Sequence, residues 1–151
     1  MISWNSPFAI SYPTWVNMIG ITTRNTVLFV KQYRHGAGEI FIELPAGVVE
    51  DGEDPAIAAK RELLEETGYA FEHIEYVCKL YANPATSGNL TYTYFLSGGV
   101  KVQEQDLDSS EDIEVVEMSI EEAKALLLNN NIGQALHSAA LFYTFSKIGL
   151  L

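Results

Sequence analysis

Short runs of apolar and β-branched residues follow one another along the chain and predict a series of strands. Between the first two runs, Arg24 and Asn25 suit a tight hairpin turn. The third run stops at Pro45, because a proline restricts the residue that precedes it. The predicted strands cover residues 16–22, 26–32, 40–44, 75–80, 90–96 and 113–118.

A helix is predicted between the third and the fourth of these strands. Asp54 is a candidate N-cap, and Pro55 stands at the first helical position, where its missing N–H has no cost. Gly68 is well placed to end the helix in a left-handed conformation.

Two more helices are predicted towards the end of the chain. Ser119 with Glu122 three residues later forms a capping-box pattern for a helix through Leu128. Residues 134–148 carry the last helical pattern. The order of strands, helix, strands and helices indicates an α+β or α/β/α sandwich with a mixed sheet in a single domain spanning residues 1–151. The sequence has neither a dinucleotide-binding glycine pattern nor a phosphate-binding P-loop.

The composition of the chain limits which classes of partner and substrate it can bind. The chain has 151 residues, 48% of them hydrophobic, and a formal net charge of −11. So acidic a chain, without a local Lys/Arg cluster, should repel nucleic acid and anionic membranes. A phosphate-bearing substrate would then need a divalent cation to mediate the contact.

Cys78 is the only cysteine and is expected to be a buried core thiol. The chain start lacks a signal-peptide pattern, so a cytoplasmic protein is expected.

The first predicted helix is unusual because acidic residues gather on one side of it. On a helical wheel Glu62, Glu65 and Glu66 are mutual neighbours, and the small Ala58 and Ala59 share their side and are expected to leave open volume there. The opposite side is expected to face the core through Ala56, Ile57, Leu63 and Leu64.

Three carboxylates at these spacings repel one another unless something binds them. The repulsion costs roughly 0.2–0.5 kcal/mol per pair when the groups are merely solvated, and a bound cation reverses its sign. Hard oxygen ligands on a rigid helix suit Mg²⁺ or Mn²⁺. Arg61 lies off the direction of Glu62 on the wheel and is expected to pair with Glu65 or to reach Glu53. A merely solvated acidic face is the alternative.

The spacing around this helix is specific. It consists of Gly47, five residues, Glu53, seven residues, Arg61-Glu62-Leu63, one residue, Glu65-Glu66, one residue, Gly68 and Tyr69. This pattern resembles the signature of the Nudix hydrolases, with every fixed charged and glycine position occupied. Only Tyr69 departs, because the family usually has an aliphatic residue there.

The resemblance implies a Nudix fold with a loop–helix–loop motif that holds divalent cations. It assigns metal-ligand roles to Glu62, Glu65 and Glu66, with a backbone carbonyl of Ala46 or Gly47 as a further ligand. It also implies that Glu53 and Arg61 are structural partners, and that Gly47 and Gly68 are structural positions of the motif.

The mechanism implied is attack of water on a pyrophosphate whose charge Mg²⁺ neutralises. A carboxylate must accept the proton of that water. Glu62 and Glu65 are candidates within the motif. Glu111, in the acidic stretch of residues 106–112, is a candidate outside it, because a loop glutamate in about this position is implicated in the ADP-ribose branch of the family. A solvated acidic loop is the alternative for Glu111.

Outside the motif the chain resembles the ADP-ribose pyrophosphatase branch, which also hydrolyses other nucleoside diphosphate sugars. The resemblance rests on residues 30–34, on Glu43 leading into the motif, and on Pro84, sixteen residues beyond Gly68. Arg34 suits a phosphate or ribose contact because of its planar fork, although an ion pair is the alternative. The other expected substrate contacts are Tyr33, Glu43 and Pro84.

Two departures from the branch leave the substrate open. Asn89 stands about where the branch carries a glutamate, which removes one possible ligand or base. The alternative activities are pyrophosphohydrolysis of nucleoside triphosphates and, in another class, ligand sensing without catalysis.

The second departure is the N-terminal extension, residues 1–15, which is short for the branch. Its aromatic residues are expected to cover the sheet or to form a homodimer contact: Trp4, Phe8, Tyr12 and Trp15.

The three histidines are not expected to bind a metal together. His35 follows Arg34 in a loop and could touch the substrate, whereas His73 and His137 are expected to be surface or helix residues.

Overall fold

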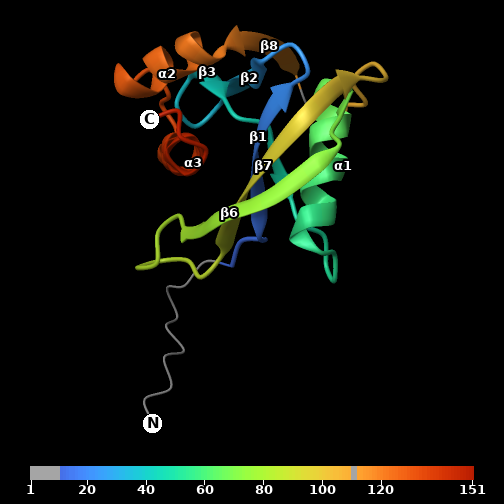
Figure 1. Ribbon diagram of the computed structural model, residues 1–151. Coiled ribbons are helices and arrows are strands. Elements are labelled where there is room, and N and C mark those ends of the chain that lie inside the picture. Colours follow the sequence, from blue (N-terminus) through green and yellow to red (C-terminus); the bar gives the residue numbers. More distant parts are fainter. Residues whose placement is uncertain (1–10, 110–111) are drawn as a thin grey trace.

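The computed structural model describes residues 11–109 and 112–151 (Figure 1). Trp4, Phe8 and Glu111 lie outside the described residues, so the predictions made for them stay predictions. None of the helices in the described part of the chain is long and apolar enough to cross a membrane.

Within the described residues the strands form one eight-stranded mixed sheet. Its main path runs β3-β2-β1-β7-β5, while β4 pairs with β1, β6 with β7 and β8 with β2. β1 and β7 run parallel, and the other pairs are antiparallel. The strands are β1 (Trp15–Thr22), β2 (Thr26–Arg34), β3 (Glu39–Glu43), β4 (Ala46–Val48), β5 (Tyr69–Ala70), β6 (His73–Tyr81), β7 (Leu90–Lys101) and β8 (Ile113–Ser119).

The helices cover both faces of this sheet, which confirms the predicted sandwich. α1 (Pro55–Thr67) lies on one face, and α2 (Ile120–Leu128) and α3 (Ala135–Lys147) lie on the other (Figure 1). One core cluster packs beneath α1 through Leu63, Met18 and Leu96, and a second packs beneath α3 through Phe145 and Ile19.

The helix ends are those that the sequence predicts. Asp54 caps α1 by accepting from the Ala56 N–H at 2.8 Å. Gly68 ends α1 with φ 75°, a left-handed conformation that glycine adopts without steric cost. Ser119 and Glu122 form the complete capping box of α2.

The predicted core face of α1 is wrong in part. Ala58 and Ala59 are buried rather than beside open volume, and Ile57 is 60% exposed. The buried stripe follows the i, i+4, i+7 positions Ala59, Leu63 and Glu66, because this side packs on the sheet. The helical wheel gives the relative directions of side chains but cannot say which direction the sheet takes.

Tyr69, the departure from the family signature, has a hydrogen-bonded role. Its hydroxyl donates to Glu117 on β8 and accepts from Arg24 Nη2 at 3.2 Å, while Thr26 Oγ1 also donates to Glu117 at 2.6 Å. The pKa of Tyr69 is raised, chiefly by burial. Arg24 also pairs directly with Glu117, so an aliphatic residue at position 69 would remove one of three groups that donate to this carboxylate.

Cys78 is only half-buried in β6, which corrects the prediction of a core thiol. The register of β6 with β7 shifts between Tyr76 and Cys78, so the alternation of buried and exposed positions is interrupted there.

Candidate active site

An ion pair between Glu53 and Arg61 fixes the loop that precedes α1. Arg61 Nε donates to Glu53 Oε1 at 3.0 Å, and Arg61 Nη2 donates to Glu53 Oε2 at 3.0 Å. The same Nη2 donates to the Val48 carbonyl at 3.1 Å, which connects the helix to β4. Hydrogen bonds from Arg61 lower the pKa of Glu53. One guanidinium therefore holds loop, strand and helix together.

Arg61 also faces the acidic residues of α1. Its Nη1 donates to Glu62 Oε1 at 2.9 Å and to Glu65 Oε2 at 3.1 Å. The expected contacts of Arg61 with Glu65 and with Glu53 are both confirmed, and its long side chain also reaches Glu62, which was not expected. The hydrogen bonds with Glu53 and Glu62 help to raise the pKa of Arg61.

Gly47 leaves the space that the Glu62 side chain occupies. A Cβ atom at position 47 would lie 2.0 Å from the Glu62 carboxyl carbon and 2.3 Å from its Oε2. Such an approach is far below a van der Waals contact, so only glycine at this position of β4 allows the observed placement of Glu62.

These residues border a cleft of about 490 Å³, called here the acidic cleft. Glu66 lies within it at 6% exposure, and its Oε2 accepts from the Ala46 N–H at 3.0 Å. The sequence did not single out Glu50, Asp106 or Asp108 as site residues. The lining residues are Trp15, Ala46, Gly47, Val48, Glu50, Arg61, Glu62, Glu65, Glu66, Asp106, Leu107 and Asp108.

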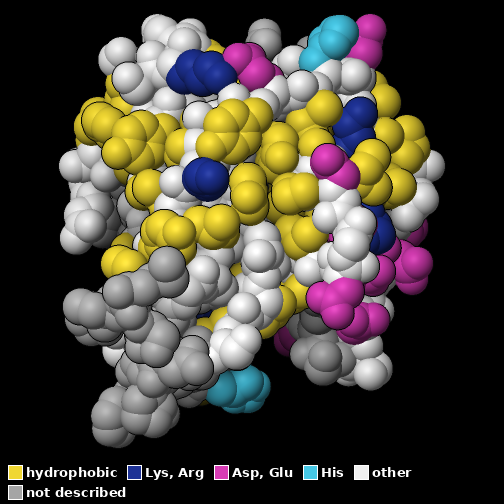
Figure 2. All heavy atoms as spheres, turned by 90° about the horizontal axis from the view of Figure 1, so that it is seen from below, with side chains coloured by type: hydrophobic (Ala, Val, Ile, Leu, Met, Phe, Trp, Pro, Cys, Tyr) yellow, Lys and Arg dark blue, Asp and Glu magenta, His cyan; other side chains and the backbone are white. Residues whose placement is uncertain are grey.

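The donor chemistry of the acidic cleft fits a hard divalent cation. In the part of the chain that the structure describes, no three acidic, histidine or cysteine side chains already stand in metal-ligating geometry, and Arg61 engages Glu62 and Glu65. The carboxylates are nevertheless oxygen donors gathered on one rigid helix and the facing loop, which is the ligand type that Mg²⁺ and Mn²⁺ prefer. Figure 2 shows acidic side chains gathered on the side of the molecule where α1 lies.

The start of the acidic stretch, residues 106–108, borders this cleft. Asp106 and Asp108 line the cleft, and the Asp106 N–H donates to the Glu65 carbonyl at 2.8 Å. This hydrogen bond holds the start of the loop against α1.

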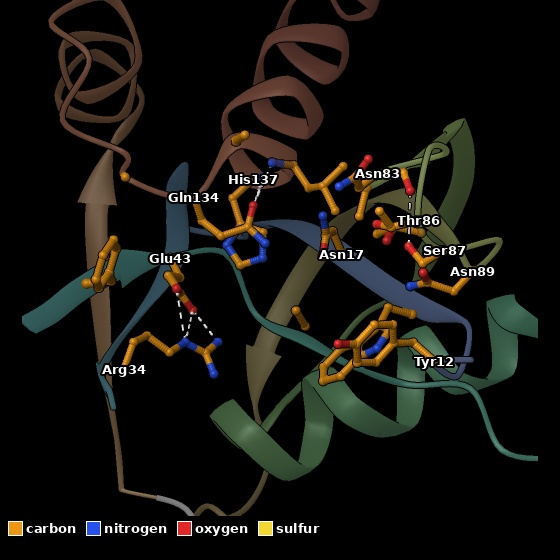
Figure 3. Close-up of a pocket in the computed structure, with 18 residues that line it drawn as sticks. Tyr12, Asn17, Arg34, Glu43, Asn83, Thr86, Ser87, Asn89, Gln134 and His137 are labelled. Atoms are coloured by element: carbon orange, nitrogen blue, oxygen red, sulfur yellow. Dashed lines mark hydrogen bonds and ion pairs between the residues drawn. The ribbon is translucent and has the colours of Figure 1, made fainter. Parts of the chain in front are cut away.

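A second, larger cleft of about 740 Å³ adjoins the first and shares Trp15 and Ala46 with it. Arg34 and Glu43 lie on one side of it, and the loop before β7 lies on the other (Figure 3). Its lining residues are Tyr12, Trp15, Asn17, Arg34, Phe41, Glu43, Ala46, Ala82, Asn83, Thr86, Ser87, Asn89, Thr91, Gly133, Gln134, Ala135, Leu136 and His137.

The larger cleft contains an ion pair whose carboxylate is buried and whose guanidinium is partly exposed. Glu43 is 2% exposed, and Arg34 Nε donates to both of its carboxylate oxygens at 3.1 Å, while Arg34 Nη2 also contacts Oε2. The hydrogen bonds to Glu43 raise the pKa of Arg34. Both residues were expected to contact the substrate, and the structure places them together in the larger cleft.

A known domain family matches most of the chain. The model of the NUDIX domain matches residues 12–139. The chain belongs to the NUDIX domain family. The family resemblance predicted from the sequence is therefore confirmed, and the matches indicate a Nudix hydrolase.

Several relatives of this Nudix protein are known. An ADP-ribose pyrophosphatase of Bacillus subtilis (strain 168) is 31% identical over 143 residues, covering 93% of this chain and 77% of that protein. A methanol dehydrogenase activator of Bacillus methanolicus is 35% identical over 115 residues, covering 76% of this chain and 62% of that protein. The match therefore spans less than two thirds of the activator's length.

One solved structure shows the same fold. The crystal structure of an ADP compounds hydrolase superposes with a TM-score of 0.81 at 21% identity, covering 91% of this chain and 75% of that chain. This likeness supports the mixed sheet between helices that the sequence predicted.

Two predicted substrate contacts of this Nudix protein lie outside the two clefts. Tyr33 borders a smaller pocket with Gln32, Arg34, His35 and Asp112, and it packs edge-on against His35 with ring centroids 5.0 Å apart. Pro84 is exposed in the loop before β7 and is not among the residues that line the larger cleft.

Asn89, the other departure from the branch, lies in the larger cleft and not in the acidic one. The glutamate that the branch carries about here was considered as a ligand or base. In this Nudix chain the position instead faces the space beside the acidic cleft.

His137 lies in α3, which confirms the helix alternative of the prediction, and it is buried rather than on the surface. Its Nδ1 accepts from the Leu44 N–H at 3.2 Å, and the ring lines the larger cleft. Burial lowers the pKa of His137 to about 4. The neutral ring with an accepting Nδ1 carries its proton on Nε2, which is then a hydrogen-bond donor.

The depressed pKa predicts that this Nudix domain loses stability as the pH falls. The unfolded imidazole takes up a proton near pH 6.5 and the folded one only near pH 4, so stability that is full above pH 6.5 is lost between these values. The loss attributable to His137 is about 3 kcal/mol over the whole window.

Urea unfolding of wild type and His137→Asn at pH 7 and pH 5 measures this effect. Asparagine retains an acceptor for Leu44 without a titrating group, so its stability should fall less between the two pH values. The exposed His73→Asn serves as the control and should retain the wild-type pH dependence. An equal loss in His137→Asn and wild type would contradict the prediction.

Proposed function

We propose that this protein hydrolyses the pyrophosphate bond of ADP-ribose or a related nucleoside diphosphate sugar, with Mg²⁺ or Mn²⁺, to give a nucleoside monophosphate and a sugar phosphate. The observation that carries the proposal is the junction of the two clefts at Ala46 and Trp15. A site with carboxylates on one side and a roomy, mostly uncharged space on the other suits a diphosphate with a bulky organic group.

The acidic cleft would bind the diphosphate through a cation held by Glu62, Glu65 and Glu66, with the Ala46 carbonyl as a further ligand. Such a cation neutralises phosphate oxygens and lowers the pKa of bound water. The chain itself supplies the proton acceptor for the attacking water. Glu62, Glu65 and Glu111 are the candidates, of which Glu111 lies outside the described residues.

The larger cleft supports a nucleoside diphosphate sugar as the substrate class. Its volume of about 740 Å³ lies within the range common for small-molecule sites. Arg34 lies at the edge of this cleft, and the exposed part of its guanidinium can donate to phosphate or ribose oxygens. Relatives named for such substrates include the Bacillus subtilis enzyme and a GDP-mannose pyrophosphatase of Citrobacter koseri, 27% identical over 138 residues.

The test is product release from a substrate panel with Mg²⁺, with Mn²⁺ and with chelator. The panel contains ADP-ribose, other nucleoside diphosphate sugars, dinucleoside polyphosphates and nucleoside triphosphates. Metal-dependent cleavage of a diphosphate sugar is expected. Cleavage confined to triphosphates would instead assign the protein to nucleotide-pool sanitation, and binding without any cleavage would assign it to ligand sensing.

Arg34→Ala is expected to raise KM by about 10-fold or more with a smaller effect on kcat, because Arg34 would bind the substrate outside the reacting centre. The substitution also leaves Glu43 buried without its partner, which destabilises the fold. The double variant Arg34→Ala/Glu43→Gln removes the stranded charge, and Glu43→Gln alone measures how much of the change in KM comes from Glu43. An unchanged KM in the double variant would remove Arg34 from the substrate site.

A further inference from the structure

The larger cleft contains buried polar atoms that lack hydrogen-bond partners. Among the described residues, Asn17 Nδ2 and Asn89 Oδ1 are the buried side-chain atoms without a partner, and both residues line this cleft (Figure 3). One atom is a donor and the other is an acceptor. Buried polar groups are almost always paired in folded proteins, so each exception calls for an explanation.

Asn17 stands where an apolar residue would stabilise the fold better. It is 2% exposed in β1, between the buried Val16 and Met18. On the same face of β1, Ile19 packs into the core beneath α3. An amide NH₂ group that has lost water and gained no acceptor, as Asn17 Nδ2 has, destabilises the folded state. A ligand that supplies the missing acceptor would remove this destabilisation.

The position of Asn17 indicates which part of the substrate it meets. Asn17 is the register partner of Ala46, the residue shared by the two clefts. Antiparallel partners lie about 4.5–5.5 Å apart at Cα, with side chains on the same face. A diphosphate in the acidic cleft would therefore place its directly attached group, a sugar, beside Asn17.

The polar groups around Asn17 carry no net charge, because each is either uncharged or paired with a group of opposite charge. Arg34 and Glu43 pair together, and the neutral His137 presents an Nε2–H donor. Asn17 offers a donor and Asn89 an acceptor. A hydroxyl group both donates and accepts, so a polyhydroxylated, uncharged group meets all of these partners.

We propose that Asn17 is a specificity-determining residue whose Nδ2 donates to a hydroxyl oxygen of the sugar attached to the diphosphate, while Asn89 Oδ1 accepts from a further hydroxyl. This inference rests on the proposed function, since it assumes that the diphosphate lies in the acidic cleft. It assigns the selection of substrates to the sugar rather than to the base.

Asn17→Leu tests the proposal because leucine has a similar branched shape without the amide. The value of kcat/KM for the diphosphate sugar that wild type cleaves best should fall about 5- to 100-fold, as expected for a lost hydrogen bond to the substrate. The melting temperature should not fall, because an unpaired buried amide has been removed. Thr93→Val is the control, since Thr93 is the buried partner of Asn17 in β7 and does not line the cleft.

Substrate analogues then identify the hydroxyl. For ADP-ribose these are the analogues that lack the 2-hydroxyl of either ribose, with IDP-ribose as the base-altered analogue. Removing the recognised hydroxyl should lower kcat/KM in wild type but lower it no further in Asn17→Leu. The ratio of wild type to variant should be the same for ADP-ribose and IDP-ribose. Asn17→Ala repeats the measurement if the leucine variant does not fold.

The outcomes separate the two proposals. If wild type cleaves no diphosphate sugar, the proposed function fails, and this inference fails with it. If wild type cleaves one and the Asn17 variants are as active as Thr93→Val, the inference alone is overturned. The same holds if the Asn17 effect depends on the base and not on a sugar hydroxyl, or if the loss of activity merely follows a loss of stability.

Discussion

Glu66→Gln is expected to lower kcat by about 10²-fold or more while leaving the fold intact. The carboxylate is buried in the acidic cleft, where it accepts from the Ala46 N–H. Glutamine keeps the shape and one accepting oxygen, so the contact with β4 survives. It loses the negative charge that a cation ligand needs. Steady-state kinetics with Mg²⁺, beside a thermal melt, measures both parts of the prediction.

Glu121→Gln is the matched control for this variant. Glu121 lies on α2 with an exposed side chain that bonds Lys124, and its substitution should change neither kcat nor stability. Wild-type turnover by Glu66→Gln would remove Glu66 from the metal site. A variant that fails to fold would show that the buried carboxylate serves the packing of α1 rather than catalysis.

Gly47→Ala is expected to reduce kcat by about 10²-fold with little change in stability. The added methyl group would overlap the Glu62 carboxylate, whose atoms lie 2.0–2.3 Å from the place that the new Cβ would take. A flexible side chain can move away at little cost, so the fold should survive. The carboxylate would then leave the position from which it can serve the acidic cleft.

Two controls separate this effect from a general one. Gly36→Ala adds a methyl group with no atom within 4 Å and should leave activity unchanged. In a Glu62→Ala background, Gly47→Ala should add little further loss, because both substitutions act through the same carboxylate. Additive losses in the double variant would contradict the proposed route.

The sequence predicted those helices and strands whose defining features lie within a short stretch of the chain. The caps at Asp54, Gly68 and Ser119 depend on hydrogen bonds within a few residues, so their positions could be predicted closely. β4 and β5 were not predicted because they have three and two residues, too few to show an alternation of apolar and polar positions.

The site was predictable where a local sequence pattern marks it, as in the signature segment and at Arg34 and Glu43. The residues from Gly47 to Gly68 carry their own spacing, and the structure gathers their carboxylates at one cleft. Asn17 and His137 join the larger cleft through sheet register and helix packing, which no local pattern encodes. The same reason explains why Ile57 was misplaced, since the facing sheet decides which side of a helix is buried.

The parallel pairing of β1 with β7 has a consequence for how the protein is made. β1 emerges early during synthesis, but its partner β7 follows only after the whole signature segment has been translated. Pairing across such a separation closes a long loop and slows folding. Until then the nascent chain carries a strand edge without a neighbour and a helix whose core lacks Tyr94 and Leu96. This interval is when the chain is most prone to aggregation, and when a chaperone would help it most.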